Sequence, residues 1–286
     1  MWGDLMPRCD VCHNHCELEE GQTGICRARK YENGEFVDVN YGFLTSMALD
    51  PIEKKPLRRF FPGSLVLSVG SYGCNLRCPF CQNHEISYGF GKEYDGGVKY
   101  FAPDELVEIA EKYRDQGNIG IAFTYNEPLI GYEYIVDTSL KVHKRGMKTV
   151  LVSNGSVSER IADMVLPHID AANIDLKAFT DEFYEKTLSG NRRMVMDFIS
   201  KAAGICHLEV TTLIIPGLND SDDEMLELSE WLSNLDNGSG AEKIALHISR
   251  YFPQFKMDIP ATDVEKIYHL AELARKNLRF VYTGNC

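Results

Sequence analysis

The chain has 286 residues, enough for one large α/β domain with a small appendage or for two modest domains. Hydrophobic residues make up 44% and charged residues 25%, which is ordinary for a globular protein with a buried core. The formal net charge of −12 argues against a non-specific nucleic-acid binder, which needs a basic face to release counterions. No apolar run of about 18 residues or more is present, and Met1–Asp4 begins no signal peptide, so we expect a cytoplasmic protein without a membrane span.

Seven of the nine cysteines fall in two tight groups. They are Cys9, Cys12, Cys16 and Cys26, and then Cys74, Cys78 and Cys81. In a chain expected in a reducing compartment, such close spacing favours metal ligation over disulfides.

The first group predicts a small metal-binding segment at the N-terminus. The run C-x2-C-x3-C, completed by Cys26, can hold structural zinc or a second iron–sulfur cluster, and the sequence leaves both open. Four free thiols are the less favoured alternative, because exposed reactive cysteines are a liability. Asn33-Gly34 then predicts a hairpin, and Asp50–Leu57 reads as a proline-containing linker. We therefore expect one domain over residues 1–60 and a core domain over 61–286.

The second domain alternates short apolar runs with helix-like stretches, which predicts βαβ units and a parallel sheet. The expected strands are 65–69, 119–124, 147–153, 171–176, 208–214 and 244–248, with a terminal strand at 279–282. The expected helices are 103–116, 132–145, 158–166, 183–203, 222–235 and 263–276. Six repeats fit a partial (β/α)6 TIM-type barrel of parallel strands better than a closed eightfold one.

Cys74, Cys78 and Cys81 follow the first of these strands at the spacing C-x3-C-x2-C. Three thiolates supply one ligand fewer than an ordinary [4Fe-4S] cluster takes, so one iron would stay open for a small molecule. A zinc site or a redox-sensing cluster is the alternative for this loop taken alone. With the aromatic Phe80 before the third cysteine, the loop resembles the signature of the radical S-adenosylmethionine (SAM) enzymes.

Polar side chains at the ends of later strands should face this loop, because active sites of barrels lie at the carboxyl ends of the strands. Glu127, held on a turn by Pro128, can accept from an ammonium group, although it could also only cap a helix. Asp175 and Lys177 share one face of a strand and could be a simple surface ion pair. His247 lies in a strand, where a buried histidine of the core is the alternative.

These positions resemble motifs of the pyruvate formate-lyase activating enzyme family. Tyr125-Asn126-Glu127-Pro128 is similar to a G-G-E-P motif that holds the SAM amino group, but Tyr125 and Asn126 stand in place of its two glycines. Ser153-Asn154 is similar to a T-N-G turn that contacts SAM, and the D-L-K motif at 175–177 implies a lysine on the SAM carboxylate and a monovalent cation near Asp175. The resemblance also places His247 near the adenine and ribose, and Phe80 in the cofactor loop.

Across nearly its whole length the chain resembles the AmmeMemoRadiSam-system radical SAM proteins. The N-terminal cysteines, residues 50–57, Cys81–Asn83 and Tyr282–Asn285 carry this resemblance. It implies AMMECR1-like and Memo-like proteins as partners, because the family takes its name from neighbouring genes for such proteins.

The expected activity is therefore reductive cleavage of SAM at a [4Fe-4S] cluster, with an electron from flavodoxin or ferredoxin. The resulting 5′-deoxyadenosyl radical would take a hydrogen atom from a glycine of a partner protein, as in glycyl-radical activases, or from another protein or small molecule. The competing hypothesis of another class is a non-catalytic iron–sulfur electron carrier or redox sensor.

Overall fold

The computed structural model describes residues 6–89 and 97–286, so the expectation about Met1–Asp4 lies outside the described residues. One eight-stranded sheet organises the fold, in the order β12-β11-β10-β9-β8-β7-β5-β4. Its strands are β4 (Ser46–Pro51), β5 (Leu65–Gly70), β7 (Asn118–Phe123), β8 (Lys148–Ser153), β9 (Ala171–Asp175), β10 (His207–Ile214), β11 (Ala245–Arg250) and β12 (Phe280–Gly284). Neighbours are parallel throughout except for the antiparallel pair β4–β5.

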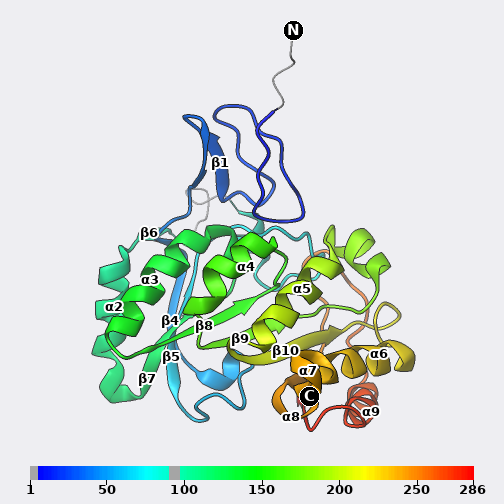
Figure 1. Ribbon diagram of the computed structural model, residues 1–286. Helices are drawn as coiled ribbons and strands as arrows, with labels where there is room; N and C mark the ends of the chain where they lie inside the picture. Colours follow the sequence, from blue (N-terminus) through cyan, green and yellow to red (C-terminus); the bar gives the residue numbers. More distant parts are fainter. Residues whose placement is uncertain (1–5, 90–96) are drawn as a thin grey trace.

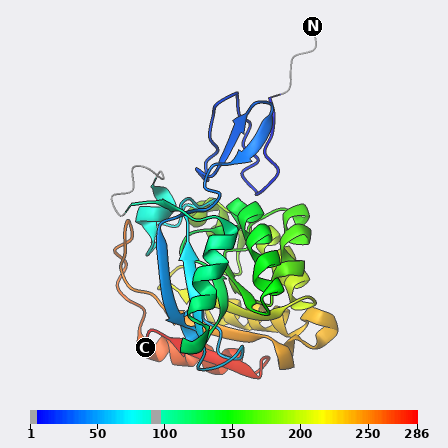
Figure 2. The ribbon, with the colours of Figure 1, turned by 90° about the vertical axis from the view of Figure 1, so that its left-hand side faces the viewer.

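Helices cover the outer face of this sheet, as Figures 1 and 2 show for the helices between β7 and β10. The helices are α1 (His84–Tyr88), α2 (Pro103–Lys112), α3 (Tyr132–Lys144), α4 (Glu159–Val165), α5 (Arg192–Ala203), α6 (Asp222–Ser233), α7 (Leu235–Gly238), α8 (Gly240–Lys243) and α9 (Val264–Ala274). Each long helix presents an apolar face to the sheet, and Asn191, Ser221 and Asp263 cap α5, α6 and α9 with their side chains. The predicted partial barrel of parallel strands is confirmed. Within residues 6–89 and 97–286, no helix is both long and apolar enough to cross a membrane.

The N-terminal segment stands apart from the sheet, at the top of both views in Figures 1 and 2. Its predicted hairpin is confirmed as β1 (Arg29–Glu32) and β2 (Glu35–Asp38), joined through Asn33-Gly34. Two short strands, β3 (Phe43–Leu44) and β6 (Lys99–Tyr100), pair beside it. The division of the chain at residue 60 stays a prediction, and β4, which precedes it, joins the edge of the large sheet.

The prediction of one helix over 183–203 is wrong. A short π-helix over Phe183–Leu188 ends at Ser189, whose φ of 51° is left-handed, and α5 begins only at Arg192. The chain breaks here because it approaches the cysteine loop closely. A Cβ on Gly190 would lie 2.7 Å from Cδ2 of Leu76, and the Leu188 carbonyl accepts from the Arg77 amide at 2.8 Å.

The prediction that Asp50–Leu57 is a linker is also wrong. Asp50 and Pro51 end β4, and the chain then crosses the barrel as a floor segment, residues 52–61. Ile52, Leu57 and Phe60 pack there against Val66, Ala122, Val150 and Ala171 from the strands. Periodicity could not reveal this because the segment is neither strand nor helix, and its burial comes from long-range packing.

Hydrogen bonds fasten the floor segment to the middle of the sheet. Asn173 Nδ2 donates to the Pro56 carbonyl at 2.9 Å, and the Glu209 carboxylate accepts from the amides of Arg58 and Arg59 at 3.1 and 2.8 Å. The Glu209 carboxylate also forms hydrogen bonds with His207 Nε2 at 2.9 Å and with His247 Nε2 at 2.5 Å. Burial would raise the pKa of Glu209, but these partners outweigh burial and lower the pKa to about 2.

We expect Glu209→Gln to lower the free energy of unfolding by roughly 3 kcal/mol at neutral pH. This figure follows from the pKa of Glu209, which falls from 4.5 in the unfolded chain to about 2 in the folded protein. Because the folded pKa is depressed, this stability is present above the unfolded pKa and is lost as pH falls through the folded one. Urea unfolding of the metal-free protein should therefore show the gap between wild type and variant closing between pH 4.5 and about 2. Glu272→Gln, with a side chain that is 73% exposed, is the control. A constant gap across this window would contradict the prediction.

Candidate functional site

A cavity of about 350 Å³ opens at the carboxyl ends of the strands. It collects side chains from the loop after β5, from the ends of β8 to β11 and from the start of the floor segment. The lining residues that sequence analysis had singled out are Cys74, Cys78, Phe80, Cys81, Asn126, Glu127, Ser153, Asn154, Asp175 and Lys177. These residues are spread over positions 74–177 of the chain, and the parallel topology brings them together.

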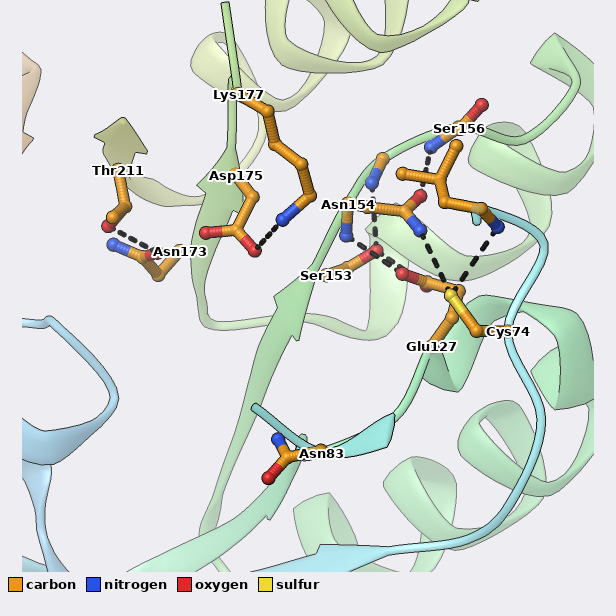
Figure 3. A network of polar contacts seen from close by, with 12 residues as sticks. Cys74, Asn83, Glu127, Ser153, Asn154, Ser156, Asn173, Asp175, Lys177 and Thr211 are labelled. Carbon is orange, nitrogen blue, oxygen red and sulfur yellow. Dashed lines mark hydrogen bonds and ion pairs between the residues drawn. The ribbon is translucent and has the colours of Figure 1, made fainter. Parts of the chain in front are cut away.

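The three thiols of the cysteine loop lie at one wall of the cavity. Cys74 Sγ accepts from the Leu76 amide at 3.4 Å and from Asn154 Nδ2 at 3.8 Å (Figure 3). Burial raises the pKa of the Cys74 and Cys78 thiols, and nearby Lys177 partly offsets this for the pKa of Cys78. Donors and a cation aimed at buried sulfurs suit thiolates that give their charge to a metal centre.

Glu127 is buried on the turn after β7, with only 2% of the residue exposed. Its Oε1 accepts from Ser153 Oγ at 2.7 Å and from the Leu129 amide at 3.0 Å, and its Oε2 accepts from the Asn154 amide at 2.8 Å (Figure 3). Burial raises the pKa of Glu127 to about 7, against the effect of these donors. The carboxylate is therefore rigid and poorly hydrated, which favours interaction with a positively charged ligand group.

Tyr125, which stands in place of a glycine of the motif, has a left-handed φ of 74°, a conformation that favours glycine. Its ring packs on Gly70, where a Cβ would lie 2.8 Å from the ring, and its hydroxyl donates to Asp50 Oδ2 at 2.7 Å. Asn126 turns back to the start of the cysteine loop, donating to the carbonyls of Tyr72 and Gly73 at 3.2 and 3.1 Å. Both substituted residues thus tie the turn that carries Glu127 to neighbouring segments of the barrel.

Asp175 and Lys177 lie on the same face, as their alternation predicted, and they form an ion pair with Nζ of Lys177 2.9 Å from Oδ2 of Asp175 (Figure 3). Burial would lower the pKa of Lys177, but Asp175 and Cys78 outweigh burial and raise the pKa above its usual value. The lysine therefore stays protonated beside the cysteine loop. It can hold a ligand carboxylate near the thiols.

His247 is the one predicted cofactor residue that is not among the described lining residues of the cavity. Its ring bonds to Glu209 and lies 5.3 Å from the ring centre of Tyr282, deeper in the barrel. Thr211, its neighbour on β10, reaches the cavity instead.

Sequence reasoning missed Asn75, which lies inside the cysteine loop itself. The residue is fully buried, and its Nδ2 donates to the Ser156 carbonyl at 2.7 Å while its Oδ1 accepts from Asn154 Nδ2 at 2.9 Å. Asn75 thus ties the loop to the turn after β8. The signal available in the sequence was an amide side chain between two cysteines of the C-x3-C-x2-C loop.

The N-terminal segment packs directly on the cysteine loop. Asn14 Nδ2 donates to the Asn75 carbonyl at 2.9 Å, His13 Nδ1 lies 2.8 Å from Ser156 Oγ, and a Cβ on Gly73 would lie 2.3 Å from the Cys26 carbonyl oxygen. Cys9, Cys12 and Cys26 are buried, and burial raises the pKa of all three thiols. The segment therefore belongs to the surroundings of the candidate site.

The family model for the radical SAM superfamily matches residues 68–232, more than half of the chain. The chain belongs to the radical SAM superfamily. It is therefore an enzyme, and membership implies a [4Fe-4S] cluster and SAM as cofactors.

Relatives agree with this assignment. An uncharacterized protein of Methanocaldococcus jannaschii is 38% identical over 286 residues, covering 99% of this chain and 82% of the relative. The pyruvate formate-lyase-activating enzyme of Clostridium pasteurianum is 24% identical over 199 residues, covering 68% of this chain and 81% of that enzyme. Among solved structures, SuiB of Streptococcus suis bound to SAM has a TM-score of 0.56 and 14% identity, covering 75% of this chain and 48% of SuiB. This likeness supports the radical SAM fold.

The three thiols of the cysteine loop line one cavity, and their assignment to a [4Fe-4S] cluster stays a prediction. Among the described side chains, no three or more His, Cys, Asp or Glu are arranged around a position for a single metal ion. A [4Fe-4S] cluster makes a different demand, because each thiolate binds a different iron. Structural zinc at the N-terminal cysteines would need four ligands close to one ion, at about 2.3 Å for each sulfur. The described arrangement does not offer such a position, and the metal of that segment stays a prediction.

Proposed function

We propose that this chain is a radical SAM enzyme in which Cys74, Cys78 and Cys81 hold the cluster and the adjoining cavity holds SAM. When bound, the cluster supplies the electron that splits SAM into methionine and a 5′-deoxyadenosyl radical, which takes a hydrogen atom from the substrate. One observation carries the proposal: the three thiols, the buried Glu127 and the Asp175–Lys177 pair line the same cavity.

The chain's own residues have distinct tasks in this proposal. Glu127, fixed by its donors, accepts from the SAM ammonium, and Lys177 offsets the charge of the SAM carboxylate. Asp175 keeps Lys177 protonated and leaves its second oxygen for a monovalent cation. Ser153 and Asn154 hold Glu127, and Phe80 at the wall excludes water from the cluster. His247 acts from a distance, by fixing Glu209 and the floor segment.

The hydrogen donor defines two versions of the proposal. The likeness to a pyruvate formate-lyase-activating enzyme favours a glycine of a partner protein as the donor. The sheet is open between its edge strands β4 and β12, which suits entry of a peptide loop. Modification of another protein or of a small molecule is the alternative. A flavodoxin or ferredoxin reductant, AMMECR1-like and Memo-like partners and a cytoplasmic location stay predictions.

The deciding experiment is anaerobic reconstitution with iron and sulfide, followed by dithionite and SAM and chromatography for 5′-deoxyadenosine. We expect multiple turnovers that depend on dithionite. A non-catalytic electron carrier or redox sensor would take up iron and form no 5′-deoxyadenosine, and that result would contradict the proposal. Repeating the assay with candidate protein substrates and recording EPR spectra then separates glycyl-radical activation from other modifications.

A further inference from the structure

The floor of the cavity carries two lysines to which the proposed cofactor site gives no task. Lys54 and Lys55 follow β4 at the start of the floor segment, and both line the cavity. The Lys55 side chain is 4% exposed, with Nζ 2.9 Å from Asp50 Oδ2 and 4.5 Å from the centre of the Tyr125 ring. The Lys54 side chain is 67% exposed, and its Nζ lies 3.5 Å from Asp50 Oδ1. A buried cation and an accessible one therefore stand together at this wall.

Asp50 cannot neutralise both lysines. This single carboxylate accepts from Lys55, from the more distant Lys54 and from the Tyr125 hydroxyl at 2.7 Å. Burial would raise the pKa of Asp50, but Tyr125 and Lys55 outweigh burial and lower the pKa to about 2, so one negative charge faces two ammonium groups. At the other wall, the charge of Asp175 is matched by Lys177. The floor therefore carries an excess positive charge into the cavity.

Tyr125, which packs against Lys55 and binds Asp50, is itself held in place by its surroundings. Tyr125 keeps a left-handed φ of 74°, a conformation that is unfavourable for a residue with a side chain. Its carbonyl accepts from Asn83 Nδ2 at 2.7 Å, and its ring closes over Lys55. Backbone strain of this kind persists where the surroundings over-determine it, and it concentrates at ligand sites.

We propose that Lys54 and Lys55 form a subsite for an anionic group of the substrate, either a carboxylate or a phosphate. Lys54 makes the direct contact, Lys55 contributes its buried charge, and Asp50 and Tyr125 position both. An ammonium group is a point charge with rotatable donors, so it accepts either anion. This inference rests on the proposed function, since it concerns the molecule that reacts in the same cavity.

The test measures how strongly anions protect Lys54 from reductive methylation, in which formaldehyde forms an imine with the amine and cyanoborohydride reduces the imine. The reconstituted protein with SAM is labelled anaerobically in chloride, inorganic phosphate or glutarate at equal ionic strength, and peptides are quantified by mass spectrometry. We expect phosphate, glutarate or both to slow methylation of Lys54 by about threefold or more. Lys186 is the matched control in the same sample, because its side chain is 73% exposed and, like Lys54, pairs with a carboxylate four residues earlier in the chain.

Each outcome has one meaning. Protection by phosphate alone assigns a phosphate-bearing substrate, protection by glutarate alone assigns a carboxylate-bearing one, and protection by both supports the shared subsite. Equal rates in all three salts, or equal slowing of Lys54 and Lys186, would overturn the proposal. Lys55→Met should raise the anion concentration needed for half-protection severalfold, and the wild-type measurement decides alone if that variant does not fold. Formation of 5′-deoxyadenosine by the same sample shows separately whether the proposed function holds.

Discussion

Replacing Cys78 with alanine should abolish formation of 5′-deoxyadenosine, lowering its rate by at least about 10⁴-fold, or roughly 5 kcal/mol. Cys78 is 9% exposed and lines the cavity, where burial raises the pKa of its thiol to about 11 although nearby Lys177 partly offsets that effect. Without this thiolate only two cysteines of the loop remain to hold the proposed cluster, and two ligands cannot both retain it and keep one iron open. The measurement combines iron and sulfide analysis with the chromatographic assay, and the iron lost should correspond to one cluster.

Cys206→Ala is the matched control. Cys206 is a half-buried thiol whose pKa burial raises to about 12, and it lies outside the cavity, where its Sγ contacts the Ala202 carbonyl at 3.6 Å. Its removal should leave iron content and turnover unchanged. Full activity in Cys78→Ala, or equal losses in the two variants, would show that the cysteine loop does not hold the catalytic centre.

The sequence predicted the scaffold because local periodicity determines it. Strands buried on both faces leave apolar runs, and the βαβ rule then sets the direction and neighbourhood of each strand. The same reasoning predicted that Glu127 and Lys177, 50 residues apart, would face one cavity, since both follow strands of one parallel sheet. Residues placed at strand ends are therefore predictable from pattern alone.

Features that depend on long-range packing were not predictable in this way. The break at Ser189 exists because Gly190 passes Leu76 closely, and no property of residues 183–203 announces that contact. The floor segment has the composition of a linker, yet its apolar residues fill the barrel and its lysines reach the cavity. His247 has the expected position on its strand, but the partner that holds it, Glu209, lies on the neighbouring strand.

Tyr125 stands where the motif that this turn resembles has a glycine. It adopts a left-handed φ of 74°, a conformation that favours glycine. The Tyr125 hydroxyl bond to Asp50 and the ring contact with Lys55 supply interactions that glycine could not make. The substitution thus couples the turn that carries Glu127 to the cationic floor of the cavity.

Glu127→Gln should lower kcat/KM for SAM cleavage by about 10³-fold, or roughly 4 kcal/mol. This is the cost of removing one partner of a buried charge pair and leaving the other charge unpaired. In the proposed complex the SAM ammonium faces this carboxylate, which is fixed by Ser153 and by the amides of Leu129 and Asn154. A glutamine has nearly the same volume as the glutamate, but it carries no negative charge. Its amide NH2 group would also face hydrogen-bond donors that lose their acceptor.

Kinetics at saturating and limiting SAM separate the two roles of Glu127. If Glu127 binds the ammonium equally in the ground and transition states, KM should rise in the variant and kcat should change little. If Glu127 mainly aligns the sulfonium for cleavage, kcat should fall together with kcat/KM. Ser153→Ala, which removes one of the donors to Glu127 but keeps its charge, is the comparison and should have a much smaller effect. Iron content should stay that of the wild type in both variants, because neither residue is proposed to bind the cluster. An unchanged kcat/KM in Glu127→Gln would mean that the buried carboxylate serves the turn after β7 alone, and that SAM is held by other groups of the cavity.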